Sequence, residues 1–312
     1  MQPSLLQYFK GRETKPTMFV DLFCGAGGAS AGAAAAGLSV VLAVDAWDKA
    51  IACHALNHPD ATHMCMTLPP KDPLPLPPDG SRWHLHGSPP CTIVSKANQL
   101  RDPQRRKDAV ALIKWFIDFA LESSCTTWSL EQVASPIVME LIESYKNIDA
   151  PHRAKIDYEV FNFVNLGVPQ PRRRLIAGSA TVVARLRRAP RVHRSVRDVI
   201  TKPRGTHVRN QVRRANNESP KIVDGKRVYT YKWCVDDDYC KPISGPAHVV
   251  VAAYKLRWAR PGTGTKFKLF NTRESAALQC FPENYKFPKE SSLSIKLIGN
   301  ALPPTIMQQM LG

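Results

Sequence analysis

The sequence predicts an α/β protein built on a parallel sheet, with a basic insertion and a C-terminal segment that returns to the first domain. Strand-like and helix-like segments alternate over residues 17–56, an order typical of parallel strands joined by crossover helices. At about residue 181 the composition changes to a basic, proline-interrupted sequence that continues to about residue 267, and helix-and-turn sequence follows. A chain of 312 residues is long enough for one domain of ordinary size and a smaller second lobe.

The first four predicted elements are short and clearly bounded. An apolar segment at 17–23 predicts a buried strand that runs into the glycine turn Cys24-Gly-Ala-Gly-Gly28. Residues 30–37 predict an alanine-rich helix that Gly37 ends. Residues 39–44 predict a second strand that ends at Asp45, and a second helix is expected at about 49–56.

Later strands lead to further polar residues. Residues 67–79 are rich in proline and predict an irregular connection, after which a short strand at 83–86 leads to Gly87-Ser-Pro-Pro-Cys91. Apolar spacing predicts a helix at 107–122, and a strand at 126–130 ends at Glu131. Apolar segments at 160–164 and 175–178 flank Gly167-Val-Pro-Gln-Pro-Arg-Arg-Arg174.

The charge of the chain indicates what it binds. The formal net charge is +17 and the pI is near 9.7, and residues 185–214 contain eleven Lys or Arg but one acid, Asp198. A surplus of this size favours a polyanion such as nucleic acid. A solvated basic face is the simpler alternative, but apolar residues such as Val196 and Val212 interrupt the run and favour a folded basic surface over a disordered arm.

The composition also excludes several protein classes. The hydrophobic fraction, 44%, is that of a globular protein, and no apolar run approaches the length of a membrane span. The N-terminus is too polar for a secretory signal. Eight cysteines occur without any C-x-x-C pair, which argues against zinc and for reduced thiols. We expect a soluble intracellular protein, in the nucleus or at a viral replication site of a eukaryotic host, or in a prokaryotic cytoplasm.

The glycine turn and the second strand predict a nucleoside-containing cofactor. Glycines after a strand let the backbone approach a ligand closely, and Asp45 can bind both hydroxyls of a ribose. Trp47 can lie against a purine face, although core packing explains this residue equally well. The turn contains no lysine for phosphates, which disfavours ATP and GTP.

Other groups predict chemistry at the same edge of the sheet. Cys91 follows two rigid prolines at a strand end, which suits a nucleophile, whereas a buried structural thiol is the alternative. Glu131 ends a different strand, where a half-buried carboxyl can deliver a proton. Arg172 and Arg174 point to one side and can hold a base oxygen, a carboxylate or a phosphate, unless they belong to a basic surface strand.

In their order along the chain, these motifs resemble those of the DNA (cytosine-5)-methyltransferase family. The similarity spans about residues 17–178 and 270–307. The matching segments are Asp21-Leu-Phe-Cys-Gly-Ala-Gly-Gly28, Gly87-Ser-Pro-Pro-Cys91 with Ser95 and Ala97, Glu131-Gln-Val133, Gly167-Val-Pro-Gln170 with Arg172 and Arg174, Leu278-Gln-Cys-Phe-Pro282, and Gly299-Asn-Ala-Leu-Pro-Pro304. Six motifs in one order make the resemblance specific.

The resemblance implies a Rossmann-like S-adenosylmethionine-dependent methyltransferase fold with a small basic target-recognition insertion. It implies methyl transfer from S-adenosylmethionine to C5 of cytosine in double-stranded DNA, with S-adenosylhomocysteine as the product. The base would leave the duplex, the Cys91 thiolate would add to its C6, and Glu131 would donate a hydrogen bond or a proton at N3. Arg174 would hold the base oxygen and Arg172 would steady the pocket. The implied cofactor shell is Asp21, Phe23, Gly25, Gly27, Gly28, Asp45, Trp47, Asn300 and Ala301, and no metal is expected.

The resemblance also divides the chain. The implied parts are a leader at 1–15, a catalytic α/β domain at 16–180, a target-recognition region at 181–267 and a C-terminal return to the catalytic domain at 268–312. Most arginines of the target-recognition region would bind phosphates and a few would read bases. We expect the protein to be a monomer.

The chain departs from the family pattern at four places. Thr92 stands where the family usually has Gln, which puts the behaviour of the catalytic loop in doubt, and Gln132 stands where Asn is typical. The strand that normally offers an acid to the adenine amino group has Met64-Cys65 instead. The closing helix after Pro304 is short. None of these changes removes a chemical group that the reaction needs.

The leader contains one more pattern, Gln2-Pro-Ser-Leu5-Leu-Gln-Tyr8-Phe9. It resembles the peptide that binds the sliding clamp PCNA, because one helical turn would place Leu5, Tyr8 and Phe9 on one face as a hydrophobic plug. An amphipathic segment without a partner is the alternative, since short motifs often match by accident.

Three other functions agree with parts of the sequence. A branch of the family methylates tRNA, but its Cys-Phe-Thr signature does not occur here. A zinc cytidine deaminase is suggested by His84, His86 and Cys91, yet it needs Pro-Cys-x-x-Cys, and position 94 is Val94. A catalytically weak DNA-binding relative is disfavoured by the presence of both Cys91 and Glu131, although Thr92 leaves it open.

Overall fold

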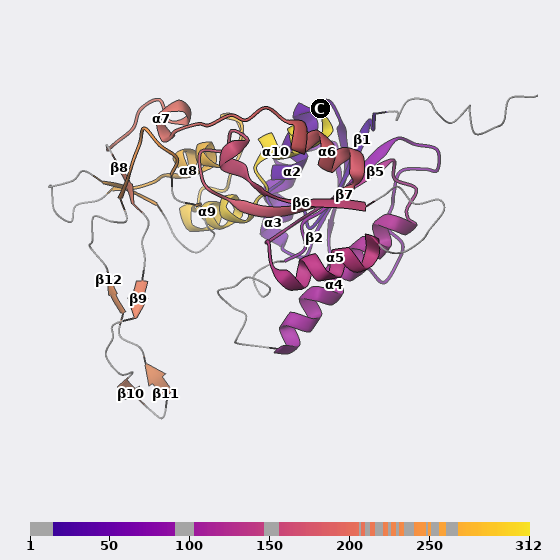
Figure 1. Ribbon diagram of the computed structural model, residues 1–312, viewed down its shortest axis with the longest axis horizontal. Helices are drawn as coiled ribbons and strands as arrows, with labels where there is room; N and C mark the ends of the chain where they lie inside the picture. Colours follow the sequence, from indigo (N-terminus) through magenta and orange to yellow (C-terminus); the bar gives the residue numbers. More distant parts are fainter. Residues whose placement is uncertain are drawn as a thin grey trace, which may run out of the picture.

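A seven-stranded sheet forms the body of the protein (Figure 1). The computed structural model describes residues 15–90, 103–146, 156–205, 207–209, 213–215, 221–223, 226–228, 231–233, 240–247, 249–250, 256–259 and 268–312. The sheet consists of β1 (Met18–Leu22), β2 (Ser39–Asp45), β3 (Thr62–Cys65), β4 (Trp83–Gly87), β5 (Thr127–Gln132), β6 (Ile156–Asn162) and β7 (Arg173–Ser179). The predicted nucleophile Cys91 and the leader residues Gln2, Leu5, Tyr8 and Phe9 lie outside the described residues.

The strand order β3-β2-β1-β4-β5-β7-β6 reverses direction next to β1. The chain moves outward from β1 through β2 to β3, then returns to the other side of β1 with β4 and continues to β5. These strands are parallel, so their carboxyl ends lie at one edge. Ligands of open α/β sheets bind at that edge, at the point where the order reverses.

Helices cover both faces of the sheet (Figure 1). One face carries α4 (Pro103–Glu122) and α5 (Pro136–Lys146), which bury Phe116, Ile117 and Ile142 against the strands. The other face carries α2 (Gly28–Ala35), α6 (Ala180–Arg188) and α10 (Pro304–Leu311). On this face α10 packs on α2 and on α6, so the C-terminal segment completes the helical layer to which α2 belongs.

The basic region forms small antiparallel sheets. A four-stranded sheet has the order β13 (Cys240–Pro242), β8 (His207–Arg209), β14 (Arg257–Ala259) and β15 (Lys268–Leu269). Two pairs, β9 (Arg213–Ala215) with β12 (Tyr231–Trp233) and β10 (Lys221–Val223) with β11 (Lys226–Val228), extend away from the main sheet in Figure 1. A separate core joins this region to α8 (Thr272–Leu278) and α9 (Ser291–Asn300) through Val208, Phe270 and Leu278.

The predicted α/β architecture is confirmed, with local differences. Strand β7 runs antiparallel to both of its neighbours, β5 and β6, because only the short 3-10 helix η1 (Phe163–Asn165) and a loop connect β6 to β7, too little for a crossover helix. Glu131 lies inside β5 rather than after it, since it pairs with Ile176 of β7. The predicted boundary at residue 180 falls at the start of α6, which still packs on β6 and β7.

Two connecting elements complete the description. Helix α3 (Asp48–Ala55) joins β2 to β3, and the short helix α7 (Val196–Val199) lies in the basic region.

Within the described residues, no helix is both long and apolar enough to span a bilayer.

Candidate active site

A cavity of about 320 Å³ opens at the carboxyl edge of the sheet, where the strand order reverses. Its wall contains most of the residues that the sequence singled out: Asp21, Phe23, Gly25, Gly28, Asp45, Trp47, Glu131, Arg172, Arg174, Asn300 and Ala301. Gly27 lies behind the wall. Residues from five separate segments of the chain therefore meet at one site.

The glycine turn forms one end of the cavity. Gly25 and Gly27 have φ angles of +53° and +84°, a region that other residues rarely adopt. A Cβ added to Gly28 would lie 2.2 Å from the backbone oxygen of Leu302, so only glycine lets the turn approach the C-terminal segment this closely. The turn is thus held against the segment that carries Asn300 and Ala301.

Asp45 ties the glycine turn to the loop after β2. Its Oδ2 accepts a hydrogen bond from the backbone N–H of Gly25 at 2.9 Å, and its Oδ1 accepts one from Trp47 at 2.8 Å. Burial raises the pKa of this carboxyl. Each oxygen keeps a further lone pair, so the carboxylate can still accept hydrogen bonds from a ligand hydroxyl.

Trp47 lies partly in a core and partly in the cavity wall. It packs against a small core around Ala50 and Leu297, and it also lines the cavity. The ammonium of Lys296 lies 4.4 Å from the centre of its ring. The indole therefore has a fixed orientation at the cavity wall.

Glu131 and Arg174 form the other end of the cavity. The Nε of Arg174 lies 2.9 Å from Oε1 of Glu131, at ion-pair distance but without hydrogen-bond alignment. The two side chains are 18% and 9% exposed, so they are largely withdrawn from water yet accessible from the cavity. A carboxyl and a guanidinium side by side can together hold the two edges of a polar heterocycle.

Arg172 lines the cavity and binds the segments around it. Its guanidinium donates to the backbone carbonyls of Val250, Gly299 and Ala301, each at 3.3 Å. Those carbonyls belong to the basic region and to the C-terminal segment. The side chain is 3% exposed, and it joins both segments to the start of β7.

The segment that precedes Cys91 is also anchored. Gln132 donates from Nε2 to the carbonyl of Pro89 at 2.7 Å, and its Oε1 accepts the N–H of Val133. Both Pro89 and Pro90 line the cavity. Sequence reasoning treated Gln132 only as a mild departure and missed this role; its place directly after Glu131 was the available signal.

A row of buried polar side chains lies beneath this segment. Ring nitrogens of His84 and His86 each lie 2.8 Å from the hydroxyl of Ser129, and the row continues at one end to Thr127 (2.8 Å) and at the other to Ser88 (2.9 Å). Burial lowers the pKa of His86 to about 3, so these imidazoles are neutral. Sequence reasoning did not anticipate the row.

The same histidines bear on the deaminase alternative. His84 and His86 bind hydroxyls, and within the described residues no group of three or more His, Cys, Asp or Glu side chains is placed to hold a metal ion. This part of the chain therefore offers no zinc site.

Asp21 has an unusual environment at the floor of the cavity. Its side chain is 1% exposed, and Oδ2 accepts a hydrogen bond from Ser30 at 2.6 Å, while Oδ1 is buried without a hydrogen-bond partner. Burial, with a smaller contribution from the charge of Asp45, raises the pKa of Asp21 to about 7. A carboxyl in this state is ready to ionise when a cation approaches.

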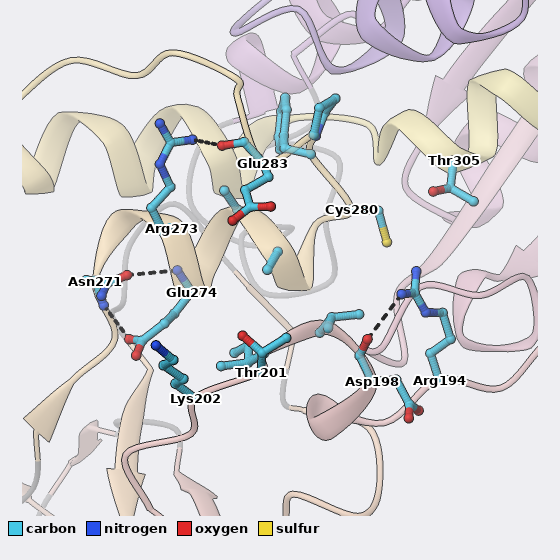
Figure 2. A pocket seen from close by; sticks show the side chains of 16 residues that line it. Arg194, Asp198, Thr201, Lys202, Asn271, Arg273, Glu274, Cys280, Glu283 and Thr305 are labelled. Atoms are coloured by element: carbon cyan, nitrogen blue, oxygen red, sulfur yellow. Dashed lines mark hydrogen bonds between the residues drawn. The ribbon is translucent and has the colours of Figure 1, made fainter.

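A second cavity, of about 640 Å³, lies between α8 and the segment around α7 (Figure 2). Three of its charged side chains serve the protein's own structure. Arg273 donates to the carbonyl of Glu283 at 2.8 Å, Arg194 donates to the carbonyl of Asp198 at 3.3 Å, and Glu274 takes part in the cap of its own helix. We assign this cavity to the junction between the basic region and the C-terminal segment.

Comparisons with known proteins identify a family. The sequence model described as C-5 cytosine-specific DNA methylase matches residues 17–244 and 188–312. The type II methyltransferase M.HgiDI of Herpetosiphon aurantiacus is 25% identical over 303 residues, which cover 91% of this chain and 89% of that protein. M.AgeI of Thalassovita gelatinovora is 32% identical over 171 residues, 52% of this chain but 39% of the relative.

Solved structures share the fold. A prophage-encoded protein of E. coli superposes with a TM-score of 0.60 at 18% identity, covering 95% of this chain and 97% of that one. A DNMT2 variant of Spodoptera frugiperda gives a TM-score of 0.57 at 15% identity, covering 94% and 98%. These likenesses concern the architecture, which is that of the seven-stranded sheet and its C-terminal return.

Proposed function

Since the chain belongs to the C-5 cytosine-specific DNA methylase family, we propose that its cavity binds S-adenosylmethionine at the glycine turn and an extruded cytosine beside Glu131. The chain is a DNA cytosine-5 methyltransferase by this membership. One observation carries the proposal for the site: the glycine turn with Asp45 and the Glu131–Arg174 pair line the same cavity.

The residues at the first end of the cavity fit a charged nucleoside cofactor. The glycine turn provides a close backbone approach, Asp45 has lone pairs for ribose hydroxyls, and Trp47 offers a ring of fixed orientation. The unpartnered Oδ1 of Asp21 favours a ligand with positive charge. When bound, S-adenosylmethionine supplies the methyl group that C5 receives. Asn300 and Ala301 complete the wall.

The second end suits the pyrimidine. Glu131 donates a hydrogen bond or proton to N3, and Arg174 holds the base oxygen, so that electron density is drawn from the ring and C6 becomes open to addition. The thiolate of Cys91 then forms a bond to C6, which makes C5 nucleophilic. Loss of the C5 proton to water, departure of Cys91 as a thiolate and return of the N3 proton to Glu131 restore the aromatic ring. Arg172 keeps the two ends of the cavity together.

The basic region supplies the contacts with DNA. Arg187 is neutralised by Asp157 and Glu159, and Arg204 by Glu274, so these two serve the fold. Exposed cations without such a role, Arg188, Arg191 and Lys202 among them, would bind phosphates of the duplex from which the cytosine is extruded.

A trapping experiment tests the mechanism. A DNA duplex with 5-fluorocytosine at the target position should form a covalent adduct with the wild-type protein in the presence of S-adenosylmethionine, and Cys91→Ser should form none. Methyl incorporation should be found with duplex DNA and should be low with tRNA. Full methyl transfer by Cys91→Ser would contradict the covalent step, and preferential transfer to tRNA would favour the RNA alternative.

We also propose that the leader binds a PCNA-type sliding clamp through Gln2, Leu5, Tyr8 and Phe9. Such contact would direct the enzyme to newly replicated DNA. Immobilised clamp should retain the wild-type protein and not a variant with Tyr8→Ala and Phe9→Ala, while both methylate free duplex DNA equally. Equal retention of the two proteins would contradict the proposal.

A further inference from the structure

A row of hydrogen-bonded side chains runs from the floor of the cavity to the surface behind the glycine turn. It begins at Asp21, whose Oδ2 lies 2.6 Å from the hydroxyl of Ser30. That hydroxyl lies 2.9 Å from Nε2 of His54, and Nδ1 of His54 lies 2.8 Å from Nε2 of His63. Asp21, Ser30 and His54 are buried, whereas His63 is partly exposed. The row thus connects a buried carboxyl with solvent.

Within the described residues, the shift in the pKa of Asp21 has no contribution from a cation, although Arg172 and Arg174 line the same cavity. The groups that face it are Asp45 at the end of β2, Cys24 in the turn, His54 on α3, His86 beside it on β4 and Tyr285. Burial keeps both histidines neutral by lowering the pKa of His54 to about 2 and that of His86 to about 3. Burial raises the pKa values of Cys24 and Tyr285, so these also stay neutral. Asp45 adds a negative charge.

We propose that Asp21 distinguishes S-adenosylmethionine from S-adenosylhomocysteine, because it ionises when the positively charged cofactor binds and its proton leaves through Ser30, His54 and His63. The inference rests on the proposed function, since it requires this cofactor in the cavity. The two molecules differ by a methyl group and by the positive charge on sulfur. In surroundings of low dielectric, that charge has a large effect on a carboxyl without a counter-ion.

The proton transfer balances at each group. With Asp21 neutral, its O–H donates to Ser30, Ser30 donates to Nε2 of His54, and Nδ1–H of His54 donates to Nε2 of His63. Each donor then passes its proton one step along the row, and His63 releases its Nδ1 proton to water. All hydrogen bonds are retained in the reversed direction, with Asp21 as a carboxylate that accepts from Ser30.

The wild-type protein should therefore show proton-linked binding. With Asp21 titrating at about 7, affinity for S-adenosylmethionine should rise about tenfold from pH 6 to pH 8 and change little above that. Affinity for S-adenosylhomocysteine should stay nearly level, since it lacks the charge on sulfur. Product inhibition should accordingly be weakest in alkaline solution.

Calorimetry measures the number of protons that the protein releases when it binds a ligand. The heat of binding in buffers of different ionisation enthalpy gives the number of protons released, which should be about 0.9 at pH 6, about 0.5 at pH 7 and about 0.1 at pH 8 for S-adenosylmethionine. S-adenosylhomocysteine should release almost none. Equal proton release by both molecules, or none by either, would overturn the proposal.

Two variants separate this role from a structural one. Asp21→Asn keeps an acceptor for Ser30 but cannot ionise, so it should remove proton release and the pH dependence. Ser30→Ala removes a hydrogen bond that lowers the pKa of Asp21, so it should move the rise in affinity to higher pH. The matched control is His58→Gln, which alters a ring beside His54 outside the row and should keep the wild-type profile.

The outcomes also separate this inference from the proposed function. Methylation of duplex DNA by the wild-type protein at pH 8 tests the activity by itself. If the wild-type protein methylates DNA normally but releases no proton when it binds S-adenosylmethionine at pH 6, the role of Asp21 is refuted while the proposed function stands. Identical pH profiles for Asp21→Asn and the wild-type protein would refute it as well.

Discussion

Replacement of Ser129 by Ala should destabilise the protein far more than one lost hydroxyl suggests. The Ser129 hydroxyl lies 2.8 Å from Nε2 of His84 and 2.8 Å from Nδ1 of His86, and all three side chains are fully buried. One ring nitrogen must donate to the hydroxyl and the other must accept from it. Without the hydroxyl, a buried N–H and a buried lone pair both lose their partner, at about 1–3 kcal/mol each. We expect a loss of about 3 kcal/mol.

Removal of the three central groups of the row, which leaves only the terminal hydroxyls of Thr127 and Ser88, should cost less. In a triple variant with Ser129→Ala, His84→Leu and His86→Leu, no ring nitrogen remains unsatisfied, and the expected loss is about 1 kcal/mol. Urea denaturation followed by circular dichroism gives both values, and thermal midpoints should fall by about 6 °C and about 2 °C. If the triple variant proved less stable than Ser129→Ala, reasoning from unsatisfied groups would be wrong for this sheet.

Three other predictions concern the site and its surroundings. Gly28→Ala would place a methyl group 2.2 Å from the backbone oxygen of Leu302. It should weaken cofactor binding at least tenfold, as measured by titration, and lower the free energy of unfolding by about 2 kcal/mol, as measured by denaturation. Arg172→Lys keeps the charge but cannot reach three carbonyls, and should lower kcat/KM about 100-fold in a methylation assay while trapping of 5-fluorocytosine DNA persists at a reduced rate. His54 and His86 have folded pKa values of about 2 and about 3, so the unfolded state takes up protons first: the stability that these two residues contribute should be full above pH 6.5 and should fall by about 4 kcal/mol by pH 5, offset in part by Asp21, whose raised pKa acts with the opposite sign, and denaturation curves that show greater stability at pH 5 than at pH 7 would contradict this sign.

Sequence reasoning selected residues that the fold brings to one cavity, although their functional roles stay predictions. Asp45 and Glu131 were identified because each ends or nearly ends a strand, and parallel strands bring such ends to one edge. Arg172 was expected to steady the pocket; it donates hydrogen bonds to three backbone carbonyls, and its role in the reaction stays a prediction. The catalytic role of Cys91 stays a prediction, because this residue lies outside the described part of the chain.

The two rows of hydrogen-bonded side chains, one from Thr127 to Ser88 and one from Asp21 to His63, could not be predicted in the same way. His84 and His86 alternate with apolar residues along one strand, which is typical of a half-buried strand and says nothing about a partner. Ser129 comes into contact with them only because β4 and β5 pair in one register, and a shift of one residue would turn its side chain to the other face. Likewise, nothing in the sequence links Asp21 to His63.

The sequence by itself determined the α/β class, the order of the motifs and the residue types at the carboxyl edge, because strand periodicity and turn chemistry are local properties of the chain. Only the tertiary structure decided how those residues are paired and ionised. The free carboxylate oxygen of Asp21, the anchoring of Pro89 by Gln132 and the bracing by Arg172 depend on burial and on contacts between distant segments. Desolvation and long-range packing have no signature in the spacing of residues, which is why the charge state of the cavity could be read only from the folded chain.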